Sequence, residues 1–192
     1  MPILRLTPEM MIGELPEHNE ESIRGGVGGN YDTVKVMKRV ARERAGHPLV
    51  RQLAAQIVMS RGIPSMHYLD ESKVIGEYVW SKVRYLRDPL EHEYLQDPLK
   101  MITDIQNGRA QGDCDDMALL VATLLLSIGH RPLFRVVRYK GYLGPYNHIY
   151  VVDYETNPGE KSKRIVLDAI VKARPIGFEV PHVSGEELEI VE

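Results

Sequence analysis

The chain has 192 residues, of which 43% are hydrophobic and 27% charged, a balance typical of a globular protein rather than a collagen, a coiled coil or a low-complexity chain. Its net charge is −3, so the molecule as a whole has no strong field that would attract nucleic acid. The longest apolar run, from Met117 to Ile128, is too short to span a bilayer, and the sequence opens without a secretion-signal pattern. We therefore expect no membrane span and no secretion. The single cysteine, Cys114, excludes an internal disulfide.

The first part of the chain divides into two expected units. Residues 1–30 are rich in proline and glutamate and end near a run of glycines, so we expect a flexible arm. Residues 31–66 carry apolar residues at helical spacing and are expected to form a helical extension, with a second helix starting at Pro48. The first of these helices has a basic face, which is either a docking surface for an acidic partner or a solvated face. That face comprises Lys35, Lys38, Arg39, Arg42 and Arg44.

The rest of the chain changes from helical to strand periodicity. Helices are expected after Asp70, after Asp97, and from Met117 to Ile128, where apolar residues cover most sides and indicate a central buried helix. Beyond Gly129 the apolar period is two, which predicts strands over 133–139, 148–154 and 164–170. We predict an α+β domain over 67–180, with helices packed on an antiparallel β-sheet. The acidic tail, 181–192, is either an edge strand or a loose end.

Three side chains suggest chemistry. Cys114 opens the buried helix, where unpaired N–H groups and the helix dipole would stabilise a thiolate and lower the thiol pKa. His148 begins a strand directly after a loop, and Asp168 lies inside an apolar run, where a buried carboxylate needs a hydrogen-bond donor. From spacing alone, each also has a plainer reading: a buried cysteine behaves as a small hydrophobic residue, and a strand histidine can be structural.

These residues lie in recognisable motifs. The segments Gly112-Asp113-Cys114-Asp115-Asp116-Met117, Asn147-His148-Ile149-Tyr150 and Leu167-Asp168-Ala169 resemble the transglutaminase-like superfamily of papain-related folds. The compact length and Leu95-Gln96-Asp97-Pro98 look most like versions encoded by bacteriophages and prophages. The tryptophan that many members carry before the aspartate is absent, and Lys163-Arg164-Ile165 stands there.

The resemblance implies a cysteine enzyme that transfers an acyl group of a protein or peptide through a thioester, with Cys114 as nucleophile, His148 as base and Asp168 orienting the imidazole. Hydrolysis and transamidation both remain open. It also implies a location in the host cytoplasm or the virion, and the alternative of a non-catalytic assembly protein that binds phage structural proteins.

The remaining expectations concern auxiliary groups. Gln111 and Gln106 precede the cysteine and are candidates for an oxyanion donor, or else plain surface amides. Asp115 and Asp116 fall in the first helical turn, where acids favour the helix dipole and need no other role. The sequence has no calcium-loop motif and too little sulfur for a typical zinc site, so we expect no metal and no cofactor.

Overall fold

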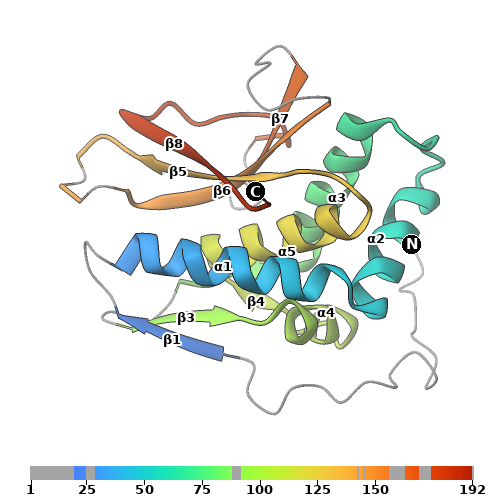
Figure 1. Cartoon of the computed structure of the whole chain (residues 1–192), viewed down its shortest axis with the longest axis horizontal. Coiled ribbons are helices and arrows are strands. Elements are labelled where there is room, and N and C mark those ends of the chain that lie inside the picture. The colour runs from blue at the N-terminus through green and yellow to red at the C-terminus, as the bar shows by residue number, and fades with distance from the viewer. Residues whose placement is uncertain are drawn as a thin grey trace.

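The computed structural model describes residues 20–24, 29–87, 92–141, 143, 144, 146–155, 163–168 and 174–191. Within these ranges helices dominate the first two-thirds of the chain and strands the last third (Figure 1). The elements are β1 (Glu20–Arg24), α1 (Gly29–Ala45), α2 (Pro48–Ser60), α3 (Tyr68–Lys82), β2 (Arg84–Tyr85), β3 (His92–Gln96), α4 (Pro98–Gln106), β4 (Gln111–Gly112), α5 (Cys114–Ser127), β5 (Leu133–Arg138), β6 (His148–Tyr154), β7 (Arg164–Leu167) and β8 (Ser184–Glu189).

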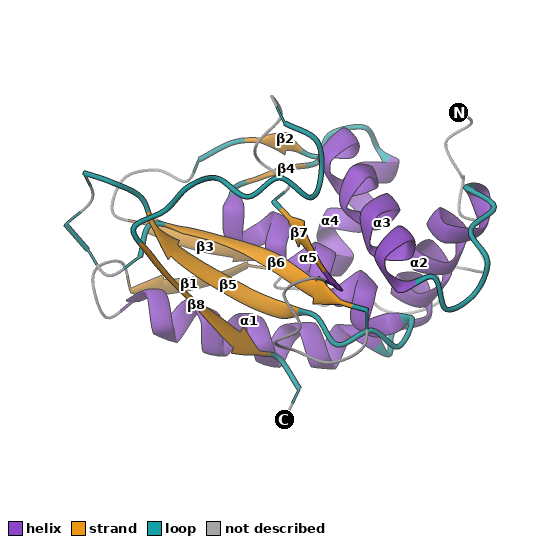
Figure 2. Cartoon of the chain, turned by 90° about the horizontal axis from the view of Figure 1, so that it is seen from above, coloured by secondary structure: helices purple, strands orange, loops and turns teal. Residues whose placement is uncertain are grey.

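The main sheet is antiparallel and lies on one side of the helices. Its strand order is β7-β6-β5-β8, so the predicted meander forms its centre and the C-terminal segment adds an edge. Figure 2 shows the helices gathered on one side of this sheet, with α1 running beneath β5 and β8. The predicted α+β class, with helices packed on an antiparallel sheet, is confirmed. None of the described helices combines the length and the apolar character needed to cross a membrane.

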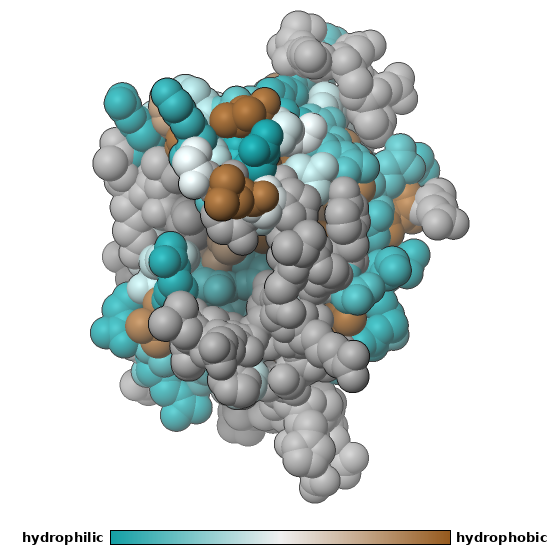
Figure 3. All heavy atoms as spheres, turned by 90° about the vertical axis from the view of Figure 1, so that its left-hand side faces the viewer, coloured by the Kyte–Doolittle hydropathy of each residue, from teal (hydrophilic) through white to brown (hydrophobic). Residues whose placement is uncertain are grey.

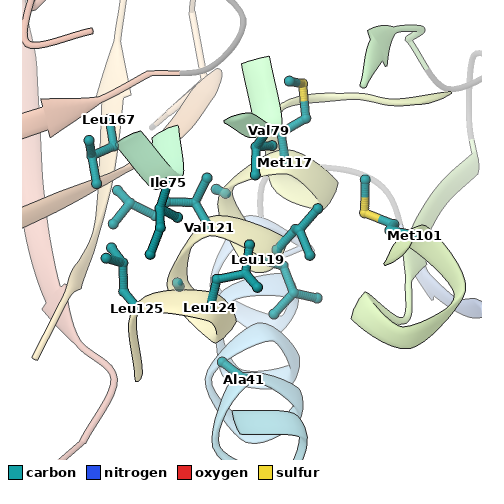
Figure 4. Packing of buried hydrophobic residues seen from close by; sticks show 14 of the residues in the cluster. Ala41, Ile75, Val79, Met101, Met117, Leu119, Val121, Leu124, Leu125 and Leu167 are labelled. Atoms are coloured by element: carbon teal, nitrogen blue, oxygen red, sulfur yellow. The ribbon is translucent and has the colours of Figure 1, made fainter. Parts of the chain in front are cut away.

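Helix α5 is the centre of the core, as its sequence predicts. Its residues from Asp115 to Leu125 are all buried, because helices α1, α2, α3 and α4 and strand β6 all pack against it. Figure 4 shows how side chains from several elements meet around this helix, including Ala41 of α1, Ile75 of α3 and Met101 of α4. A helix whose apolar residues cover most of its circumference is stable in this environment, since each face buries against a different neighbour.

Local sequence signals predict the starts of α2 and α4 correctly, and α3 starts earlier than expected. The side chain of Asp97 caps α4 by accepting a hydrogen bond from the Leu99 N–H at 2.8 Å, and Pro98 takes the first helical position. Helix α2 likewise starts at Pro48. Helix α3, expected after Asp70, begins at Tyr68, so Asp70 lies in its first turn rather than at its cap.

Helices α1 and α2 share the apolar core of the elements that follow them. Val34 and Met37 of α1 and Leu53 of α2 belong to the same buried cluster as α5. The expected unit boundaries stay a prediction. Strand β1 falls within the expected arm and pairs with β3. The other residues of 1–30 ahead of α1 lie outside the described residues. The acidic tail contains β8, which pairs with β5 at the edge of the main sheet, so the tail forms an edge strand and not a loose end.

The basic face of α1 is partly neutralised within the chain. Lys35 lies 3.5 Å from Asp32, and Arg39 lies 3.4 Å from Glu43. Arg44 pairs with Asp97 at 2.7 Å. Pairs of this kind on a helix surface are typical of a solvated face. Docking of an acidic partner on this face stays a prediction.

Candidate active site

Cys114 is the first residue of α5 and is held there by the two short strands before it. Strands β2 and β4 pair in parallel, with Tyr85 opposite Gly112, and the Leu86 N–H donates to the Gly112 carbonyl at 2.9 Å. The Asp113 N–H donates to Asp116 Oδ2 at 3.3 Å, which closes the first turn. Cys114 is half-buried. The sequence pattern thus places the thiol at a fixed helix start, as expected.

His148 and Asp168 form a buried pair on neighbouring strands. His148 opens β6, Asp168 directly follows β7, and these strands pair antiparallel. His148 Nε2 lies 2.9 Å from Asp168 Oδ2, and the two residues are only 5% and 6% exposed. An ionised carboxylate accepts, so Nε2 carries the proton and Nδ1 is left as the nitrogen that can exchange one.

Cys114 and His148 line the same cavity, whose volume is about 540 Å³. One wall comes from the start of α1, a second from the segment after β2, and a third from the connection between β5 and β6. Figure 3 views the molecule from the side where α1 begins and this connection lies, and shows hydrophobic side chains scattered among hydrophilic ones. Besides Cys114 and His148, the lining residues are Thr33, Val34, Met37, Tyr85, Arg87, Asp113, Asp115, Val136, Tyr139, Tyr146, Asn147 and Ile149.

The environment of the thiol differs from the sequence-based expectation. Burial raises the pKa of Cys114 well above its ordinary value, and the charges of Asp115 and Asp113 raise it further. A hydrogen bond from the Ile149 backbone N–H acts the other way and is outweighed. The predicted lowering of the thiol pKa is therefore wrong, because desolvation and nearby carboxylates exceed the helix dipole. Cys114 rests as a neutral thiol.

This difference sets a measurable pH dependence. We expect native Cys114 to react with iodoacetamide at pH 7 more slowly than the same thiol in urea-unfolded protein, and its rate to keep rising above pH 9, because only the thiolate reacts. Intact mass spectrometry measures the rate, and Cys114 is the only possible thiol. A native protein that reacts faster than the unfolded chain at pH 7 would contradict the raised pKa.

The structure places the two oxyanion candidates away from the cavity lining. The Gln111 side chain accepts from Arg84 Nη2 at 2.7 Å, and its backbone carbonyl accepts from Gln96 Nε2 at 2.9 Å. Gln106 ends α4. Neither side chain belongs to the residues that line the cavity. The Asp116 N–H already donates to Asp115 Oδ1 at 3.0 Å, so the backbone N–H of Cys114, at the very start of α5, is the candidate oxyanion donor at this helix start.

Asp116 has a structural role that the sequence analysis missed. It is 1% exposed and accepts from both the backbone N–H and the side-chain Nε2 of Gln96, each at 2.7 Å, so it joins β3 to the start of α5. Burial raises the pKa of Asp116 to about 7. Its sequence signal is an acid in an otherwise apolar helical stretch. Because the helix dipole accounts for an acid in the first turn of any helix, this signal did not indicate a hydrogen-bonding role for Asp116.

Gly112 fits closely under this carboxylate. A Cβ on Gly112 would lie 2.7 Å from Asp116 Oδ2 and 2.8 Å from Asp116 Cβ. Gly112→Ala is therefore expected to destabilise the fold by about 1–3 kcal/mol in urea unfolding, since the helix start must shift. Gly46→Ala is the matched control, because a Cβ there meets nothing within 4 Å. Equal unfolding midpoints for the two variants would contradict this account.

A second buried cluster lies at the other end of α5. His130 Nδ1 is 2.6 Å from Asp153 Oδ2, and His130 Nε2 is 2.8 Å from Glu71 Oε2. Ser72 Oγ also donates to Asp153 Oδ2. The cluster joins α3, β6 and the segment after α5, so His130 has two carboxylate partners away from Cys114 and His148. The sequence feature that indicates this cluster is Asp153, an acid inside an apolar strand.

One group of side chains could converge on a metal ion. Asp113, Cys114 and Asp115 each present one ligand atom, and these atoms lie within 4.8 Å of one another. The set combines two hard carboxylates with one soft thiol and supplies three donors, whereas zinc sites use mainly sulfur and nitrogen and calcium takes six to eight oxygens. This donor set fits neither ion well, so we assign the two carboxylates to the charge environment of the thiol.

The chain was compared with protein families, curated proteins and solved structures. No protein-family model and no curated protein matches the chain. Among solved structures, the chain is similar to LapG of Legionella pneumophila, with 17% identity, a TM-score of 0.41, and coverage of 82% of this chain and 76% of LapG. The fold class stated above therefore rests on the observed elements and their pairing.

Proposed function

We propose that the chain is a cysteine-dependent acyl-transfer enzyme that acts on a protein or peptide. The observation that carries this proposal is the placement of Cys114 and His148 in one cavity, with Asp168 2.9 Å from His148 Nε2. A nucleophile, a base and a group that orients the base are the parts that such chemistry requires. The resemblance of the three motifs to the transglutaminase-like superfamily supports the same assignment.

The neutral thiol defines the first step. Cys114 Sγ attacks the carbonyl carbon of an amide while its proton passes to His148 Nδ1, so a C–S bond forms as the imidazole becomes imidazolium. The backbone N–H of Cys114, at the start of α5, receives the developing oxyanion. Asp168 holds the imidazolium through Nε2. Because the thiol pKa is raised, His148 acts as a general base during attack and not as the partner of a preformed thiolate.

The second step releases the acyl group. The imidazolium gives its proton to the leaving amine as the C–N bond breaks, which leaves a thioester on Cys114. Water or a second amine then attacks this thioester with His148 again as base; the C–S bond breaks and the imidazolium returns the proton to Cys114 Sγ, giving hydrolysis or transamidation. The outcome depends on how well water is kept from the thioester.

The proposal is tested by trapping the acyl-enzyme. The protein is incubated with a mixed peptide library, quenched in acid and analysed by intact mass, and hydroxylamine is then added to cleave any thioester. We expect a hydroxylamine-sensitive adduct on the wild type and none on Cys114→Ser. The control is His67→Ala, an exposed histidine outside the cavity lining, which is expected to form the adduct as the wild type does. No adduct on the wild type between pH 6 and pH 9 would overturn the proposal.

The alternative of a non-catalytic assembly protein was based on the acidic arm, the basic helix and the acidic tail, and it stays a prediction. Of these segments, the tail contains β8 of the main sheet, and β1, within the arm, pairs with β3. The resemblance to phage-encoded proteins, binding to phage structural proteins, and the host-cytoplasm or virion location stay predictions.

A further inference from the structure

The imidazole of His148 lies beside two tyrosine rings as well as Asp168. The Tyr139 ring stacks on it with the centroids 5.6 Å apart and the planes at 26°, and the Tyr150 ring lies at 5.6 Å and 40°. Tyr150 is fixed through its hydroxyl, which donates to Glu179 Oε1 at 2.7 Å. Tyr139 is half-buried and also lines the cavity, so it is the ring at the open side of the imidazole.

Asn147 fixes the position of Tyr139. Its Oδ1 accepts from the Tyr139 backbone N–H at 2.9 Å, and its own backbone N–H donates to the Val137 carbonyl at 3.0 Å. Val137 pairs directly with His148 across β5 and β6. Side chains two residues apart on a strand share a face, so Tyr139 projects on the same side of the sheet as Val137 and His148. The hairpin thus holds the stacked pair in register.

We propose that Tyr139, held by Asn147, is a positioning residue for His148. Its ring keeps the imidazole in the orientation in which Nε2 meets Asp168 and Nδ1 serves the cavity. Rotation of an imidazole by half a turn would exchange the two nitrogens and offer the wrong one to the thiol. The consequence for rate rests on the proposed acyl-transfer function, whereas the effect on the imidazole does not.

The test compares variants at both members of the pair. Tyr139→Leu removes the aromatic ring, Asn147→Ala removes only the acceptor on an exposed residue, and Tyr139→Phe keeps the ring. Nitrogen-15 NMR of histidine-labelled protein reports which ring nitrogen of His148 carries the proton, with the signal assigned from His148→Gln. We expect one dominant tautomer, protonated at Nε2, in the wild type and in Tyr139→Phe, and averaged signals in Tyr139→Leu and Asn147→Ala.

Kinetics supply the second readout. For Tyr139→Leu we expect kcat for acyl transfer to fall about 10- to 100-fold with KM little changed, and Tyr139→Phe to recover most of it. Tyr154→Leu is the control, because Tyr154 belongs to the same apolar cluster at the far end of β6, outside the cavity lining. It is expected to alter neither the tautomer nor kcat.

The outcomes separate this inference from the proposed function. A wild-type tautomer and kcat in both Tyr139→Leu and Asn147→Ala would overturn the positioning role. If the tautomer responds to Tyr139 while no variant and no wild-type sample transfers an acyl group, the proposed function fails and the positioning role stands. Asn147→Ala keeps the test decisive should Tyr139→Leu fail to fold, because the Asn147 side chain is exposed.

Discussion

His148→Ala is expected to lower the rate of Cys114 acylation by about 10²- to 10⁴-fold, the range that general-base catalysis contributes. The reason is the raised pKa of the thiol: without a base at the cavity, attack depends on the small thiolate fraction present at neutral pH. Single-turnover reaction with an activated peptide ester, followed by intact mass, gives the rate. In the variant the rate should rise steadily with pH, since only free thiolate reacts.

Slow alkylation by itself does not distinguish the enzyme from a non-catalytic protein, because burial slows it in either case. The dependence of acylation on His148 does distinguish them. His67→Ala again provides the comparison, as His67 is exposed and pairs only loosely with Asp70 at 3.7 Å. Equal acylation rates for wild type and His148→Ala would contradict the proposed role of the imidazole and favour the non-catalytic alternative.

The largest loss of stability is expected from Asp153→Ala. Asp153 is 1% exposed and accepts from Ser72 and His130, so its removal leaves the buried His130 with Glu71 as its remaining carboxylate partner. Breaking a buried charged pair by removing one partner typically costs about 3–5 kcal/mol. Urea unfolding followed by circular dichroism measures the change. A loss below about 1 kcal/mol would contradict the assigned role of the cluster.

The control variant is Glu155→Ala, which removes an exposed pair with Lys163. It is expected to change the free energy of unfolding by about 0.5 kcal/mol or less.

The same cluster makes stability depend on pH. Burial lowers the pKa of His130, but hydrogen bonds and charges from Asp153 and Glu71 outweigh it, so the net pKa is raised above 6.5. The protonated imidazole therefore stabilises the fold fully below about pH 6.5, and this contribution is lost as pH rises through the folded-state pKa. Comparing wild type with His130→Gln in urea at pH 6 and pH 9 isolates the effect. An equal stability difference at both pH values would argue against it.

Asp116 changes stability in the same direction at lower pH. Its folded pKa of about 7 lies above the usual value near 4, so the folded state binds more protons and stability falls as pH rises between these values. The wild-type curve therefore contains both contributions. Only the difference from His130→Gln assigns the alkaline part to the cluster.

Much of the fold follows from local patterns. The 3.6-residue periodicity from Met117 to Ile128 identified α5, because a helix buried on most sides needs apolar residues around its circumference. The change to a period of two after Gly129 identified β5 and β6, and Pro48 and Pro98 marked two helix starts. Cys114 and His148 could be picked out because each starts an element, and Asp168 because it is an acid inside an apolar run.

The features that the sequence did not predict depend on contacts between segments that are distant along the chain. The thiol pKa depends on burial by several elements, which no spacing within the first turn of α5 reveals. Gln96 and Asp116 are twenty positions apart, and Glu71 and His130 are fifty-nine apart, so neither pairing has a local signature. The packing of α1 and α2 on α5, far along the chain, has no local signature either.

Under the proposed function, the contribution of α1 to the cavity would separate the recognition of a substrate from the making and breaking of its bonds. Thr33, Val34 and Met37 form one wall, yet α1 supplies none of the groups proposed to move protons or electrons. Val34 and Met37 also belong to the common core, whereas Thr33 does not. Under the proposed function, a substitution at Thr33 would change the cavity wall without replacing Cys114, His148 or Asp168. A lineage of such chains could diversify its targets through one helix while its reaction stays constant.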